Sequence, residues 1–306
     1  MSQNSAIRGV LSPVVTPFTS TLEPDAARLT AHCQWLIDSN VGLAVFGTNS
    51  EANSLSMAEK RHLLDHLVSA GLPAARMMPG TGACSLTDAV ELTNAAVAHG
   101  CAGVLMLPPF YYKGVSDEGL FNFYSELIQK VGDSKLRVYL YHIPQVSNVP
   151  ITFNLIEKLL KEYPGTIAGI KDSSGDWENT RGMLENFQPQ GFDVFSGSET
   201  FLQATLNAGG AGCISATANV NPAAIANLAE HYQDANASEL QTQLDAVRDQ
   251  FQGYVMISGM KAVIAHHKGD ADWIRVRPPL TDLTAAEQKT LVAALADVGF
   301  DMPGLA

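Results

Sequence analysis

The sequence predicts an α/β protein, a (β/α)8 TIM barrel with a C-terminal helical extension. Short apolar runs rich in Val, Ile and Leu alternate with longer stretches whose apolar residues recur at helical spacing. The short runs are continuously apolar, as expected for parallel strands that are covered on both faces. About eight strand–helix units precede residue 230, and eight right-handed units that close on themselves form a barrel of about 250 residues.

The predicted strands are bounded by Gly and Pro residues, which mark the turns at their ends. They span residues 9–16, 41–47, 76–79, 103–107, 136–141, 166–170, 193–195 and 212–215. The alternative to a barrel is an open, doubly wound sheet. The number of units, and the lack of a Gly-x-Gly-x-x-Gly turn after the first strand, favour the barrel.

Helices are predicted where apolar residues recur every three or four positions. Ser56, followed three residues later by Glu59, is typical of a helix start. The predicted helices span residues 24–40, 57–70, 86–98, 117–131, 152–163, 177–186, 199–208, 221–232, 238–267 and 284–298. We expect residues 1–230 to form the barrel and residues 231–306 to form a helical extension packed on it.

The composition is that of a globular, acidic protein. The 306-residue chain is 46% hydrophobic and 16% charged, and its formal net charge is −12. This profile excludes a disordered chain, and the length is enough to bury a large core without disulfides or structural metals. Because an acidic chain without a cluster of Lys or Arg repels phosphates, we expect no nucleic-acid partner.

A cytoplasmic location without membrane contact is expected. The first residues lack the charged and apolar segments of a secretory signal, and no apolar run approaches the roughly 18 residues of a membrane helix. The four cysteines, Cys33, Cys84, Cys101 and Cys213, form no CxxC motif. Isolated cysteines of this kind are typical of reduced thiols in the cytosol.

Lys171 is the strongest catalytic candidate. It directly follows the apolar run 166–170, so we expect its stem at the mouth of the barrel, where barrel enzymes place their active sites. Burial lowers the pKa of an ammonium group, and the neutral amine can attack a carbonyl to form a Schiff base. The alternative is a strand-end lysine whose charge reaches solvent or pairs with Asp172.

Two other strand ends carry groups suited to proton transfer and carboxylate binding. Tyr141 ends the neighbouring strand, where its phenol could shuttle protons or simply pack the barrel rim. Thr48 could relay a proton between phenols. The turn 47–50 leads into a helix start, so its N–H groups could cradle a carboxylate, unless it is an ordinary turn. Glu51, just beyond, is expected to cap or pair locally.

No metal or cofactor site is predicted. His62 and His66 have a spacing that can hold a metal, but the pattern of their helix places them on a solvated face. The sequence contains no Gly-x-x-x-x-Gly-Lys-Ser/Thr loop for phosphates. The spacing of its Ser, His and Asp residues supports no hydrolase triad.

Six short motifs occur in order along the chain, each at or near an expected strand end. They are Gly47-Thr48-x-x-Glu51, Tyr111-Tyr112, Tyr141-x-Ile143-Pro144, Gly169-Ile170-Lys171-Asp172, Ser196-Gly197 and Gly212-Cys213-Ile214-Ser215. In residue type, order and spacing the chain from Gly9 to about Leu280 resembles the dihydrodipicolinate synthase / N-acetylneuraminate lyase superfamily. The resemblance adds to the prediction of a barrel.

The resemblance implies a cofactor-free class I aldolase mechanism on pyruvate or a pyruvate-derived 2-oxo acid. At matching positions, Lys171 forms the imine and Tyr141 is the general acid/base, while Thr48 relays protons to Tyr112 of a neighbouring subunit. A homotetramer, built as a dimer of dimers, is also implied. The substrate-binding residues are then Asn49 with Thr48 at the carboxylate, Gly197 and Ile214 at the imine, and Asn49, Ser173, His142 and Gln145 at the tail.

One position departs from the synthases of this superfamily. They carry an arginine soon after Tyr-Asn-Ile-Pro that binds the carboxylate of aspartate semialdehyde, and here Val146 takes that place. Valine cannot replace a bidentate guanidinium contact. We therefore expect a lyase for a substrate such as 4-hydroxy-2-oxoglutarate or a 2-keto-3-deoxy sugar acid. The alternatives are the synthase, a catalytically silent small-molecule-binding homologue, and a metal-dependent barrel lyase.

Overall fold

The computed structural model of the chain describes residues 7–305. These residues divide into two compact units. The first unit comprises residues 7–9 and 73–214, and the second comprises residues 10–72 and 215–305. The predicted division into a barrel of residues 1–230 and an extension of residues 231–306 stays a prediction.

The first unit contains a parallel sheet with the strand order β7-β6-β5-β4-β3. Nearly every residue of these strands is buried, which explains why their sequences are continuously apolar. The strands are β3 (Val104–Met106), β4 (Val138–His142), β5 (Ile167–Asp172), β6 (Asp193–Ser196) and β7 (Gly212–Ile214).

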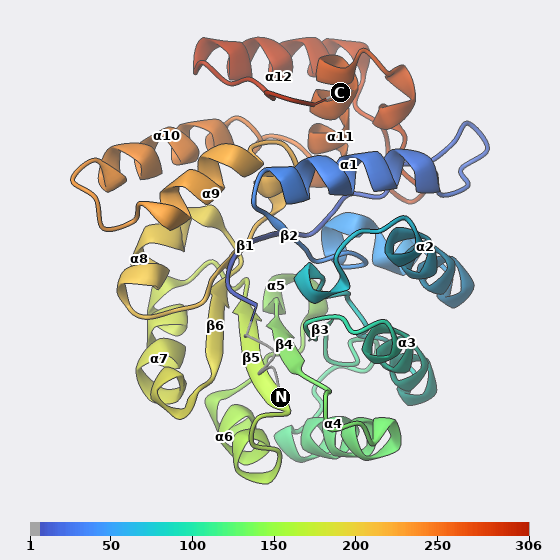
Figure 1. Cartoon of the computed structure of the whole chain (residues 1–306), viewed down its shortest axis with the longest axis vertical. Helices are drawn as coiled ribbons and strands as arrows, with labels where there is room; N and C mark the ends of the chain where they lie inside the picture. The colour runs from blue at the N-terminus through green and yellow to red at the C-terminus, as the bar shows by residue number, and fades with distance from the viewer. Residues whose placement is uncertain (1–6, 306) are drawn as a thin grey trace. The chain divides into compact units, whose positions relative to one another are not determined.

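Apart from one short helix at the end of β4, the helices of the first unit lie outside its strands (Figure 1). Most begin at a Ser, Thr or Asp side chain that accepts a hydrogen bond from the first turn. The helices are α3 (Leu86–Ala98), α4 (Asp117–Val131), α5 (Pro144–Ser147), α6 (Phe153–Glu162), α7 (Trp177–Phe187) and α8 (Leu202–Asn207). The short helix α5 was not expected from the sequence.

The predicted strand 76–79 is only partly formed. Backbone hydrogen bonds join this part of the chain to β3 and its preceding loop: Leu105 N–H donates to Pro79 O (2.9 Å), and Thr81 N–H donates to Leu105 O (3.0 Å). Only an isolated bridge at Gly80 results. Pro79 has no N–H to donate, which keeps the pairing short. Residues 7–305 therefore contain seven strands, where the sequence predicted eight.

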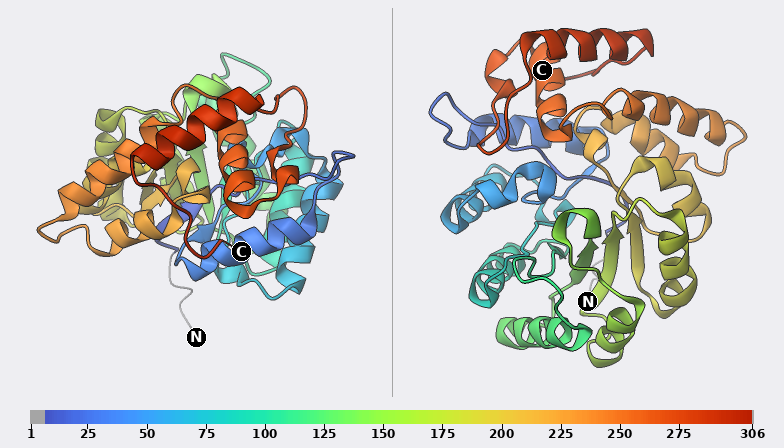
Figure 2. Two further views of the ribbon diagram at one scale, coloured as in Figure 1. Left: turned by 90° about the horizontal axis from the view of Figure 1, so that it is seen from above. Right: turned by 180° about the vertical axis from the view of Figure 1, so that it is seen from behind.

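The second unit has two parallel strands and six α-helices within its described residues. Leu11 and Ser12 of β1 pair with Gly42 and Leu43 of β2. Helix α9 lies beside α10, and α11 lies beside α12 (Figures 1 and 2). The elements are β1 (Gly9–Ser12), β2 (Gly42–Leu43), α1 (Ala26–Asp38), α2 (Met57–Ser69), α9 (Pro222–Glu230), α10 (Ala237–Asp249), α11 (Met256–Lys268) and α12 (Ala285–Asp297).

The predicted helix 238–267 is wrong as a single element. The structure breaks it into α10 and α11 at residues 250–255. Gly253 lies in the break, and glycine inside a helix costs about 1 kcal/mol relative to alanine. Within residues 7–305, no helix combines the length and apolarity needed to cross a membrane.

Candidate functional site

Lys171 and Tyr141 lie side by side on β5 and β4. They are direct partners in the strand register, and directly paired residues of parallel strands project to the same face. Lys171 Nζ donates a hydrogen bond to Tyr141 Oη at 3.2 Å and lies 4.4 Å from the centre of the tyrosine ring. Each residue is 3% exposed. An amine and a phenol are thus held together away from bulk water.

The same face of the sheet carries two further aromatic rings. Phe195 on β6 pairs with Lys171, and Tyr139 precedes Tyr141 by two residues, so alternation gives them a common face. The rings of Tyr139 and Phe195 meet edge to face, with centroids 5.9 Å apart. Gly169 makes room for them, because a Cβ there would lie 2.8 Å from the Tyr139 ring. The lysine amine thus lies over the ring of Tyr141, on a face that also carries the rings of Tyr139 and Phe195.

Asp172, the alternative partner for Lys171, is engaged elsewhere. Its carboxylate accepts hydrogen bonds from Ser174 N–H (2.9 Å), Asn179 Nδ2 (3.0 Å) and Thr180 Oγ1 (2.7 Å). Asn179 and Thr180 belong to α7, so the carboxylate faces the helices that cover the sheet. This geometry argues against a simple Lys171–Asp172 ion pair.

His142 lies apart from Lys171 in the sheet. It follows Tyr141 directly on β4 and therefore projects to the opposite face of the sheet. Its Nδ1 accepts a hydrogen bond from Ile151 N–H at 3.0 Å. Burial lowers the pKa of His142, and the charge of Asp172 opposes that shift. The lowered pKa favours the neutral imidazole, and a contact of His142 with the substrate tail stays a prediction.

Three other predicted residues meet at the carboxyl ends of β4, β5 and β6. Gln145 Nε2 donates to the carbonyl oxygen of Ser173 at 2.5 Å, and Gly197 N–H donates to Asp172 O at 2.7 Å. A Cβ on Gly197 would collide with Ser173 Oγ, so this close approach requires glycine. These bonds tie the three loops together at the strand end where Lys171 lies. Ile214 ends β7 and is fully buried.

Tyr112 projects outward after β3. It is 74% exposed and meets the ring of Tyr111 edge to face, with centroids 5.3 Å apart. Adjacent exposed tyrosines are suited to a protein interface, since each offers a large apolar ring with a polar tip. The role of Tyr112 in the site of a neighbouring subunit stays a prediction.

Thr48 and Asn49 lie in the second unit, in a single 3-10 turn of residues Thr48–Ser50. The N–H of Gly47 donates to Ser50 Oγ (3.2 Å), and the N–H groups of Ser50 and Glu51 donate back to the carbonyls of Gly47 and Thr48 (both 3.1 Å). These hydrogen bonds close the turn on itself. Thr48 and Asn49 are both partly exposed.

Sequence reasoning missed the buried partner of Glu51. The expectation of a local cap or pair is wrong, because Glu51 forms an ion pair with Lys261 of α11, and neither side chain has exposed surface. Burial lowers the pKa of Lys261 to about 8, and the charge of Glu51 opposes that shift. The available signal was a lysine inside the apolar helical run 258–265.

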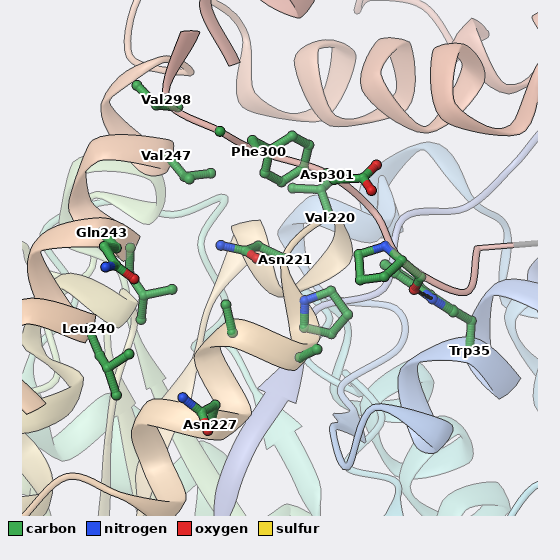
Figure 3. Close-up of a pocket in the computed structure, with 16 residues that line it drawn as sticks. Trp35, Val220, Asn221, Asn227, Leu240, Gln243, Val247, Val298, Phe300 and Asp301 are labelled. Atoms are coloured by element: carbon green, nitrogen blue, oxygen red, sulfur yellow. Dashed lines mark hydrogen bonds between the residues drawn. The ribbon is translucent and has the colours of Figure 1, made fainter. Parts of the chain in front are cut away.

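The second unit also contains an open cavity of about 640 Å³. Leu240, Gln243 and Val247 of α10 lie on one side of it, and Phe300 lies on the other (Figure 3). None of the predicted site residues lines this cavity. Among residues 7–305, no three His, Cys, Asp or Glu side chains are grouped closely enough to hold a metal ion.

Comparison with known proteins identifies the family. The site consists of a buried lysine–tyrosine pair at the strand ends of a parallel α/β fold. The sequence profile of the dihydrodipicolinate synthetase family matches residues 6–298. The chain belongs to this family. A DapA-like lyase from Chloroflexus aurantiacus is 34% identical over 290 residues, which cover 94% of this chain and 95% of that protein.

Solved structures agree with this assignment. Dihydrodipicolinate synthase from Agrobacterium tumefaciens is 26% identical and superposes with a TM-score of 0.88, covering 95% of this chain and 99% of that one. The family member YagE from E. coli, solved in complex with pyruvate, is 26% identical with a TM-score of 0.86, covering 96% and 99%. The predicted α/β, TIM-barrel-like fold is confirmed at this level.

Proposed function

We propose that the protein is a carbon–carbon lyase that binds a pyruvate-derived 2-oxo acid as a Schiff base on Lys171. The observation that carries this proposal is the buried contact of 3.2 Å between Lys171 Nζ and Tyr141 Oη. It supplies a nucleophile and a proton carrier within one hydrogen bond of each other, which covalent catalysis of this kind requires. The pyruvate bound to the relative YagE fits the same substrate class.

The chemistry follows from the two groups. The amine of Lys171 adds to the C2 carbonyl of the substrate, and loss of water leaves an iminium. Tyr141 takes the proton of the C4 hydroxyl, the C3–C4 bond breaks, and its electron pair moves to the iminium nitrogen. An aldehyde leaves and an enamine remains. Protonation at C3 and hydrolysis then release pyruvate and restore the amine.

The remaining roles rest on the family motifs. Thr48 and Asn49 are proposed to hold the substrate carboxylate through their N–H groups, and Thr48 is proposed to relay protons to Tyr112 of a neighbouring subunit. Gly197 and Ile214 would border the imine. A cytoplasmic homotetramer belongs to the same proposal, and the exposed Tyr111–Tyr112 pair supports an interface between subunits.

The substrate tail separates the lyase from its runner-up, the synthase that condenses pyruvate with aspartate semialdehyde. Val146 is 59% exposed in the short helix α5 after β4 and offers no cation for a second carboxylate. Gln145 and Ser173, at the same strand ends, offer an amide and a hydroxyl. Such groups suit a hydroxylated substrate tail, as in 4-hydroxy-2-oxoglutarate or a 2-keto-3-deoxy sugar acid.

A panel of 2-oxo acids scored for release of pyruvate tests the proposal. We expect at least one 4-hydroxy-2-oxo acid to be cleaved by the native protein and none by the Lys171→Ala variant. Lys161→Ala, which removes an exposed lysine from the end of α6, is the matched control and should be fully active. Condensation of pyruvate with aspartate semialdehyde, without cleavage of any panel member, would support the synthase instead.

A further inference from the structure

Glu51 and Lys261 form a charged cluster that the proposed chemistry does not use. Glu51 ends the turn that carries Thr48 and Asn49, and Lys261 lies in the middle of α11, 210 positions later in the chain. Neither side chain is exposed to solvent. A fully buried ion pair directly beside a proposed substrate-binding turn is unusual enough to need an explanation.

Every polar group of this pair has a partner. The ammonium of Lys261 donates to Glu51 Oε1 and to the carbonyl of Arg275 (2.7 Å), and it lies 4.4 Å from the ring centre of Phe18. The second carboxylate oxygen of Glu51 accepts the N–H of Arg277 at 2.8 Å. Glu51 is therefore bound both to α11 and to the segment that follows it.

A second layer of contacts holds this segment against the turn. The Arg277 guanidinium pairs with Glu59 of α2 at 2.5 Å, donates to the carbonyl of Ser54 at 2.8 Å, and lies 4.8 Å from the Phe18 ring. On the other side of the turn, Thr16 Oγ1 donates to the carbonyl of Ser50 at 2.7 Å. The turn is thus fixed from both sides by residues of its own unit.

The backbone of the turn is strained. The hydrogen bonds and ion pairs around the turn can hold it in this conformation. Glu51 has φ +56° and Phe46, at the start of the turn, has φ +62°. A left-handed conformation costs a non-glycine residue on the order of 1 kcal/mol or more and persists only where the surroundings impose it. Strain of this kind is characteristic of functional sites.

Stability alone does not explain a buried pair. Replacing both partners of a buried ion pair by apolar residues is often neutral or stabilising, and in some proteins such a pair instead fixes the arrangement of the groups around it. We propose that Glu51 and Lys261 are positioning residues, whose buried ion pair fixes the Gly47–Glu51 turn in the shape that binds the carboxylate of the 2-oxo acid. This inference rests on the proposed function, because it concerns how the same substrate is held.

The test measures how tightly pyruvate is held before it is trapped. Borohydride reduction of the imine is followed by mass spectrometry over a range of pyruvate concentrations, for the native protein and for the double variant Glu51→Gln/Lys261→Met. The double variant removes both charges with little change in volume, so folding is expected to survive. The control is Asp270→Asn, which removes a partly exposed ion pair with Arg28 in the same unit.

We expect the double variant to need at least tenfold more pyruvate for half-maximal trapping, while saturating pyruvate still modifies Lys171 completely. Asp270→Asn should keep the native value, even if its melting temperature falls. A folded double variant with native half-saturation overturns the positioning role and leaves the proposed function intact. If the native protein is not trapped at any concentration, the proposed function itself is wrong.

If the double variant does not fold, the single variant Glu51→Gln takes its place. It keeps the shape and an acceptor oxygen for the N–H of Arg277 but loses the charge that faces Lys261. The same tenfold rise in half-saturating pyruvate is expected, and a native value again overturns the positioning role. Loss of folding in both variants also overturns it, because the pair is then needed for the fold as a whole.

Discussion

The Lys171–Tyr141 pair and the Gly47–Glu51 turn are held in place by different means. Backbone hydrogen bonds set the first, since both residues are register partners on neighbouring strands. Side-chain contacts set the second, through a buried carboxylate and an ammonium from distant parts of the chain. Substitution of Lys171 or Tyr141 should therefore remove chemistry and spare the fold, whereas substitution of Glu51 or Lys261 should affect both.

The largest effect is expected from Tyr141→Phe. Loss of the hydroxyl removes the proposed proton carrier but leaves the strand register unchanged, so kcat should fall about 10²- to 10⁴-fold. Because the buried amine of Lys171 loses this acceptor, the free energy of unfolding should fall by about 1–3 kcal/mol. Steady-state kinetics and urea unfolding measure the two quantities. Native kcat in the variant would remove Tyr141 from the mechanism.

Lys261→Ala, unlike Tyr141→Phe, should act mainly on the free energy of unfolding. It leaves the carboxylate of Glu51 buried without its cation, which costs about 3–5 kcal/mol in the free energy of unfolding. The exposed substitution Lys161→Ala should cost about 0.5 kcal/mol or less. Urea unfolding measures the loss in both variants, and equal losses would show that Lys261→Ala does not leave the charge of Glu51 buried and uncompensated.

Gly197→Ala tests the contact between the ends of β5 and β6. The new methyl group would collide with Ser173 Oγ, so the two loops must separate, at a cost of about 1–3 kcal/mol. We expect a severalfold higher KM for the 2-oxo acid, because Ser173 shifts. Gly119→Ala on the exposed face of α4 is the control, since a Cβ there meets only Ser116 Oγ at 3.6 Å. Unchanged KM in Gly197→Ala would show that this approach does not shape the site.

The smallest effect concerns His32 in the second unit. Burial lowers its pKa to about 3, so the unfolded chain binds a proton below pH 6.5 that the folded chain does not bind until near pH 3. Stability from this residue is therefore lost as the pH falls through that window. Between pH 7 and pH 5 the loss should be about 2 kcal/mol.

His32→Phe removes this titration. Urea unfolding at both pH values should show that the variant loses about 2 kcal/mol less than the native protein when the pH is lowered. His267, whose pKa burial also lowers, is present in both proteins and cancels from the difference. Equal losses of unfolding free energy in the two proteins between pH 7 and pH 5 would contradict the lowered pKa of His32.

Much of the arrangement around Lys171 and Tyr141 could be predicted from the sequence. Continuous apolar runs located the strands. Tyr141 ends the run 136–141 and Lys171 follows the run 166–170, so the sequence placed both residues at strand ends. Strict alternation along β4 also separates His142 from Tyr141, because adjacent residues of a strand face opposite sides of the sheet.

The contacts that hold the Gly47–Glu51 turn could not be predicted in the same way. Glu51 and Lys261 are separated by 210 positions, and no local pattern links a turn to the middle of a distant helix. The end of α10 was missed for a related reason, since apolar periodicity continues across residues 250–255 while the chain itself turns. Pairing across a fold depends on packing, which a single sequence does not contain.

The most direct test of the central claim is the site of covalent attachment. The native protein is incubated with pyruvate and borohydride, digested, and mapped by mass spectrometry, with Lys171→Ala as the control. We predict that one reduced pyruvyl group is found on Lys171 and that the variant carries none. Modification at another lysine, or no modification of the native protein, would contradict the account.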